Sequence, residues 1–162
     1  MDEPARLITD NALEYGDALP EGGVLLSLDL GTKTIGVATC DAGWRYATAG
    51  KTIPRSKFTT DCGKLREIVS CRSVAGLVIG LPRNMDGTEG PRAQASRAYA
   101  RNLSQALELP ILLWDERWST ASAHAAMIGQ DISRAKRAEK IDSHAAAIIL
   151  QGAIDALAGG GF

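Results

Sequence analysis

Acidic residues occupy three positions where a folded chain seldom leaves a carboxylate without a partner. Asp29 lies inside the apolar run Val24–Leu30, and the neighbours Asp115 and Glu116 directly follow a second apolar run. Asp142 lies near the start of a helical segment, on a stripe of small apolar residues. Because an unpaired buried carboxylate is costly, such acids are normally hydrogen-bonded, ion-paired or bound to metal. These positions are therefore candidates for catalytic chemistry.

Each acid taken singly also has a structural interpretation. Asp29 can cap the turn at Gly31, the adjacent pair can be solvated loop acids, and Asp142 can offset a helix dipole. Together they favour a site, because the carboxyl ends of strands gather functional residues in open α/β sheets. Strand side chains alternate between faces, so Asp115 and Glu116 should point in different directions. Their spacing leaves open which of the two faces the site.

A cluster of carboxylates without His or Cys suits the hard cations Mg²⁺ or Mn²⁺. We expect Asp29, Asp115, Glu116 and Asp142 to form the catalytic group and two ions to be bound. Asp29 and Asp142 are the expected metal ligands together with one of the adjacent acids; we assign Glu116, and Asp115 stays the alternative. Two such ions activate a water and stabilise the leaving oxygen in phosphodiester hydrolysis. Without metal the acids repel one another, which predicts a raised pKa for at least one of them.

Basic residues accompany these acids. Lys33 follows Asp29 in the next turn, and Arg117 follows the acid pair. Four more lie in the expected loop and helix start near the third acid: Arg134, Lys136, Arg137 and Lys140. Each of the six is a candidate for binding the phosphates of a nucleic acid, which supply affinity but little sequence specificity. For any single one, a solvated surface position is the alternative interpretation.

The apolar periodicity predicts the elements that position these residues. We expect strands over 24–30, 35–40, 46–53, 74–80 and 111–114, and helices over 58–69, 92–107, 139–157 and from Ser119 or Thr120 to about 128. Continuous apolar runs such as 24–30 are typical of central strands covered on both faces. The order predicts an α/β protein with a mixed five-stranded sheet flanked by helices, which is the element order of the ribonuclease H-like fold.

The 162 residues fit one domain of ordinary size. Residues 1–23 hold six acids and one base, whereas the remainder has a net charge of +4. We expect 1–23 to be a poorly ordered acidic extension, 24–157 the domain and 158–162 a glycine-rich tail. No apolar run is long enough to cross a membrane. The three cysteines lack paired short spacing, which favours reduced thiols in the cytoplasm over a disulfide framework or zinc site.

Four segments resemble motifs of the YqgF family, also called RuvX or Holliday-junction-resolvase-like proteins. Residues 29–38 resemble its first-strand motif, and residues 80–90 its glycine-rich loop. Residues 115–120 (Asp-Glu-Arg-Trp-Ser-Thr) resemble its strand-end signature, and residues 140–151 its last-helix signature. The resemblance covers about residues 24–157 in the expected order.

This resemblance implies a ribonuclease H-like nuclease that matures the 5′ end of pre-16S ribosomal RNA in the bacterial cytoplasm. It implies metal ligands at Asp29, the Asp115–Glu116 pair and Asp142, and RNA as the partner. Branched DNA is a second substrate class, but the strand over 74–80 ends without the additional acid found in RuvC-type resolvases. A non-catalytic RNA-binding module is the other alternative. An actin-like ATPase or sugar kinase would need a second such domain and a second phosphate loop.

Overall fold

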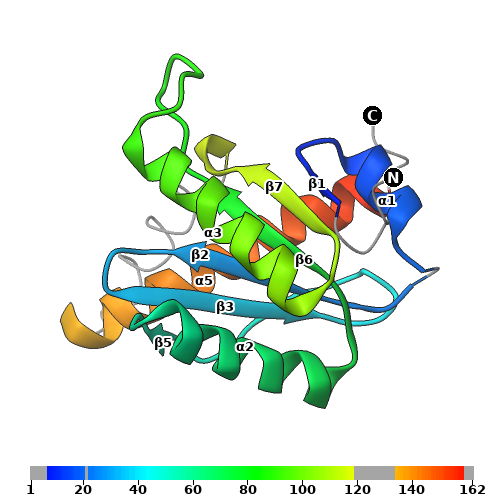
Figure 1. Ribbon diagram of the computed structural model, residues 1–162, viewed down its shortest axis with the longest axis horizontal. Helices are drawn as coiled ribbons and strands as arrows, with labels where there is room; N and C mark the ends of the chain where they lie inside the picture. The colour runs from blue at the N-terminus through cyan, green and yellow to red at the C-terminus, as the bar shows by residue number, and fades with distance from the viewer. Residues whose placement is uncertain (1–6, 21, 119–133, 159–162) are drawn as a thin grey trace.

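The computed structural model describes residues 7–20, 22–118 and 134–158, and for residues 118 and 134–142 it describes the backbone alone. Its centre is a mixed sheet with helices on both faces (Figure 1). The strands follow one another across the sheet in the order β1 (Ile8–Thr9), β7 (Ile111–Asp115), β6 (Val74–Leu81), β2 (Val24–Leu30), β3 (Thr34–Cys40) and β4 (Ala47–Ala49), and β5 (Ile53–Pro54) also pairs with β3.

Strand β2 is central, as its apolar run predicts. It pairs antiparallel with β3 and parallel with β6, and β6 in turn pairs parallel with β7. The carboxyl ends of β2, β6 and β7 therefore meet at one edge of the sheet. This arrangement confirms the predicted fold class.

The sheet has seven strands and not the five expected. One of the two extra strands arises by division of an expected strand, and the other is new. The expected strand over 46–53 is divided into β4 and β5, and between them the Gly50 N–H donates to the Val37 carbonyl oxygen at 2.7 Å. The other addition is β1, which comes from the N-terminal segment and pairs parallel with β7.

Helices cover the two faces of the sheet (Figure 1). Helices α2 (Phe58–Arg72) and α3 (Pro91–Leu107) lie over the face that carries Leu26 and Leu28. Helix α5 (Arg134–Ala158) and the short α1 (Ala12–Ala18) lie over the face that carries Leu25. The helix expected after Ser119 or Thr120 falls outside the described residues.

Hydrogen bonds attach α5 to the central strand β2 and to the segment between β4 and β5. The Ser27 hydroxyl, buried on β2, donates to the Ala146 carbonyl oxygen at 2.7 Å. The hydroxyls of Ser143 and Thr52 lie 2.6 Å apart. Helix α5 begins at Arg134, earlier than the expected residue 139, so the basic residues 134–137 belong to a helix and not to the predicted loop.

The expectation of a poorly ordered segment over residues 1–23 is wrong for residues 7–20. The Asn11 side chain caps α1 by accepting a hydrogen bond from the Glu14 N–H at 3.1 Å. The Tyr15 side chain is fully buried, and its hydroxyl donates to the Leu77 carbonyl oxygen at 2.8 Å. Only Tyr15 and Leu19, four residues apart, are buried along this segment, so it has no extended apolar stripe to be recognised.

Among the described residues, no helix is both long and apolar enough to cross a membrane.

Truncating the Tyr15 side chain should destabilise the protein. Tyr15→Ala leaves a cavity and removes the hydrogen bond to the Leu77 carbonyl oxygen, and losing a buried aromatic side chain costs about 3–5 kcal/mol. For a chain of this size that lowers Tm by roughly 10 °C, measured by circular dichroism. The control is Leu13→Ala on the same helix, where 56% of the side chain is exposed and Tm should hardly change. A Tyr15→Ala protein that melts with the wild type would show that α1 contributes little to stability.

Candidate active site

The candidate site lies at the edge where the carboxyl ends of β2, β6 and β7 meet. Asp29 is the last but one residue of β2, and Glu116 begins a short 3-10 helix, η2 (Glu116–Trp118), directly after β7. The strand register pairs Leu28 with Ile79 and Gly80 with Trp114. Gly80 on β6 therefore lies between the two acids.

The absence of a side chain at Gly80 makes room for the Glu116 carboxyl group. A Cβ atom at residue 80 would overlap Glu116 Oε1 and would lie 2.8 Å from both Glu116 Cγ and Ile149 Cδ1. Real Cβ atoms essentially never approach other atoms so closely, so a larger residue would displace the Glu116 side chain. Glycine thus lets Glu116 fold across the end of β6 toward β2.

Glu116 and Asp29 meet there and are hydrogen-bonded to each other. Burial raises the pKa of Glu116 to about 8, and the hydrogen bond and negative charge of Asp29 act in the same direction. The positive charge of Arg92 opposes this rise. At neutral pH Glu116 accordingly carries a proton, which it donates to the Asp29 carboxylate. This fulfils the expectation that one acid of the group has a raised pKa.

Asp115 has a different environment, although it is the adjacent residue. Its buried carboxylate accepts hydrogen bonds from the Arg117 backbone N–H at 3.0 Å and from Arg117 Nη2 at 2.6 Å. Burial works to raise the pKa of Asp115, but the hydrogen bonds from Arg117 outweigh it and hold the pKa below its usual range. The structure therefore brings Glu116, and not Asp115, against Asp29.

Arginines and acids form a further network on the segment between β6 and α3, which sequence reasoning missed. Arg97 forms a bidentate salt bridge with Glu89: its Nε donates to Oε1 at 2.6 Å and its Nη2 donates to Oε2 at 2.7 Å. Arg83 lies 3.6 Å from Glu89 and 3.7 Å from Asp115. No residue spacing signals these pairs, because they join side chains from the loop, α3 and the end of β7.

The structure describes the side chains of only two of the other predicted site residues, Lys33 and Arg117. Lys33 is exposed in the turn between β2 and β3. Arg117 directs its guanidinium to Asp115 and to the Met85 carbonyl oxygen, so much of its hydrogen-bonding capacity is used within the protein. Asp142 lies in α5, directly before Ser143. The side chains of Asp142, Arg134, Lys136, Arg137 and Lys140 are outside the description, and their assignments stay predictions.

The donor set of the acid pair fits a divalent cation. Asp29 and Glu116 offer only carboxylate oxygens, the ligands preferred by Mg²⁺ and Mn²⁺. The proton they share is a positive charge between two carboxylates, and a metal ion can replace it. Among the side chains that the structure describes, no group of three metal-ligating residues occurs.

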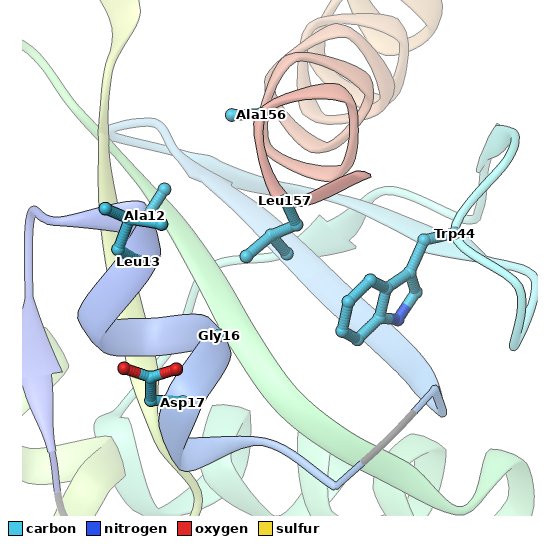
Figure 2. Close-up of a pocket in the computed structure, with 7 residues that line it drawn as sticks. All are labelled: Ala12, Leu13, Gly16, Asp17, Trp44, Ala156 and Leu157. Carbon is cyan, nitrogen blue, oxygen red and sulfur yellow. The ribbon is translucent and has the colours of Figure 1, made fainter. Parts of the chain in front are cut away.

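A cavity of about 210 Å³ lies elsewhere, between α1, the end of α5 and Trp44 (Figure 2). Its lining is mostly apolar, and Asp17 is its one titratable residue. Trp44 follows the end of β3, so this cavity is near the amino end of the antiparallel β2 and away from the acid pair. It is not the candidate active site.

Comparison with solved structures supports the fold. RuvC from Thermus thermophilus, solved in complex with a Holliday junction substrate, superposes with a TM-score of 0.56 at 11% identity. That match covers 85% of this chain and 96% of RuvC. A second Thermus thermophilus RuvC structure gives a TM-score of 0.51 at 13% identity. At such identities the similarity concerns the fold alone.

Sequence comparison is more specific. A protein of Novosphingobium aromaticivorans is 67% identical over 156 residues, which cover 96% of this chain and 100% of the relative. A protein of Sphingopyxis alaskensis is 60% identical over 93% of this chain and 99% of the relative. Both carry the name "Putative pre-16S rRNA nuclease". The family model described as RuvX, Holliday junction resolvase, matches residues 23–156, and the chain therefore belongs to the RuvX family.

Proposed function

We propose that this chain is a nuclease of the bacterial cytoplasm that hydrolyses phosphodiester bonds of RNA with Mg²⁺ or Mn²⁺, and that pre-16S ribosomal RNA is its substrate. The observation that carries the proposal is the hydrogen-bonded Asp29–Glu116 pair at the carboxyl edge of the sheet. The pre-16S rRNA nuclease name of its relatives supports the choice of substrate.

In this mechanism Asp29 and Glu116 hold the metal, with Asp142 of α5 as the proposed third ligand. When bound, two such ions make a nucleophile from water and stabilise the leaving oxygen. Glu116 must give up its proton before it can act as a ligand. Asp29 near the end of β2 and Glu116 at the start of η2 are half-buried and held by the sheet, so little further ordering is needed.

Asp115 acts through its neighbours in this proposal. Its carboxylate accepts from both the backbone N–H and the guanidinium of Arg117, and so fixes the turn that carries Glu116. Adjacent acids thereby take different tasks: Glu116 faces the proposed metal and Asp115 orients the turn. Lys33, Arg117 and the basic residues at the start of α5 are the proposed contacts to RNA phosphates.

Branched DNA is the second candidate substrate. It is favoured by the description of the family model as a Holliday junction resolvase. Against it, β6 contributes Gly80 at the site and no acid of its own. A cleavage assay that includes a four-way DNA junction beside RNA distinguishes the two substrates.

Replacing Asp29 by Asn should separate cleavage from binding. The change keeps the side-chain shape but removes a negative ligand, so cleavage of a pre-16S fragment should fall at least about 100-fold. Binding of the same RNA should persist or tighten, because repulsion of phosphate decreases. Cleavage is measured with purified protein at controlled Mn²⁺ or Mg²⁺, and binding by fluorescence anisotropy. If the variant cleaves as fast as the wild type, the activity comes from another site or a contaminant. If neither protein cleaves any substrate, the non-catalytic RNA-binding alternative is favoured.

Gly80→Ala tests the geometry of the pair. The added Cβ displaces Glu116 from Asp29, and a misplacement of about 1 Å can cost about 100-fold in rate. Gly63→Ala on α2 is the matched control, because its Cβ would meet no atom within 4 Å. That control should keep full cleavage and gain about 0.5–1 kcal/mol of stability. Equal cleavage by both alanine variants would contradict the position assigned to Glu116.

A further inference from the structure

We propose that Arg55 is a nucleic-acid-binding residue that holds a backbone phosphate next to the phosphate being cleaved. The inference rests on the proposed nuclease function and adds a substrate contact to it. Arg55 follows β5, in a part of the sequence without any of the acidic or basic motifs considered above.

The turn that follows Asp29 holds the guanidinium in place. Arg55 Nη1 donates to the Gly31 carbonyl oxygen at 2.6 Å, and the Arg55 backbone N–H donates to the Lys33 carbonyl oxygen at 2.8 Å. Gly31 lies two residues beyond Asp29. Arg55 is thus tied to the same strand end that carries the catalytic carboxylate.

Aromatic and acidic residues beneath Arg55 stiffen its segment. The guanidinium carbon lies 5.2 Å from the centre of the Tyr99 ring, within the range of a cation–π interaction. Phe58 packs edge-on against Tyr99 with ring centres 5.3 Å apart. The fully buried Asp61 accepts a hydrogen bond from the Ser56 backbone N–H at 3.0 Å. A side chain held this way loses little further freedom when it binds a ligand.

Arg55 also differs from the neighbouring arginines in its charge balance. Arg83, Arg97 and Arg117 each contact one or more carboxylates. Arg55 forms no ion pair with a described residue, and its one side-chain hydrogen bond uses one of the five N–H donors of a guanidinium. Several donors of a half-buried cation therefore have no acceptor within the described part of the protein.

A phosphate is the ligand that this group suits best. The planar fork of arginine binds two phosphate oxygens at once, and desolvated hydrogen bonds to a charged acceptor are strong. Tyr99 belongs to the core on the α2 and α3 face, whereas Ser27, two residues before Asp29, bonds to α5 on the opposite face. Arg55 and the acid pair thus lie on different sides of one strand end. This arrangement assigns Arg55 to a neighbouring phosphate and leaves the scissile one to the acids.

The test measures binding of a fluorescein-labelled single-stranded RNA 12-mer by anisotropy in EDTA, where no cleavage interferes. Arg55→Ala should weaken binding about tenfold and flatten the slope of log K against log salt by about 0.7. Arg55→Gln removes the charge but keeps an amide donor for Gly31, and should show the same slope change if Arg55→Ala folds poorly. Arg66→Ala is the control, because Arg66 on α2 donates to a carbonyl oxygen at 3.1 Å on an exposed surface, and its slope should be unchanged.

A second readout excludes a purely structural role. A series of 12-mers, each with one neutral methylphosphonate, should show a position where the wild type loses affinity and the Arg55 variants do not. Slopes and position profiles equal to those of the wild type would overturn the inference. Because binding in EDTA requires no catalysis, failure of the cleavage assay would count against the proposed function without deciding the role of Arg55.

Discussion

Two carboxyl groups occupy one small volume at the edge of the sheet, and the rest of the site is arranged around that constraint. Asp29 and Glu116 can be adjacent without metal only because they share a proton. Burial makes the proton hard to remove, and the same burial strengthens the attraction for a cation that replaces it. A divalent cation that replaces this proton is therefore attracted by two carboxylates at once.

The sheet produces this pair by simple means. Three parallel strands, β2, β6 and β7, end at the same edge, and the middle strand supplies Gly80 between the acids of its neighbours. Adjacent side chains at the end of β7 point in different directions. The Glu116 side chain therefore lies over Gly80, whereas Asp115 binds Arg117. Helix α5 packs on the same face of the sheet, where the Ser27 hydroxyl donates to the Ala146 carbonyl oxygen.

The sequence predicts the larger features because they depend on local pattern. Continuous apolar runs identify the central strands, and the acids that interrupt or follow them identify the candidate site. It cannot decide between Asp115 and Glu116, since adjacent residues differ only in direction. The role of Gly80 depends on a side chain from another strand. The N-terminal helix was missed because Tyr15 is anchored by contacts with Leu77 and Gly76, more than fifty residues away. Arg55 was missed for the same reason, because its partners Gly31 and Tyr99 come from the turn after β2 and from α3.

The most direct test of the account is proton release on metal binding. Mn²⁺ is titrated calorimetrically into metal-free protein, in buffers that differ in protonation enthalpy. With the pKa of Glu116 raised to about 8, the wild type should release most of a proton from this group at pH 7 and a much smaller fraction well above pH 8. Release falls as pH rises because the folded protein has already lost the proton. Glu116→Gln should abolish this release. Heats at pH 7 that are independent of buffer in the wild type would contradict a metal site built on the Asp29–Glu116 pair.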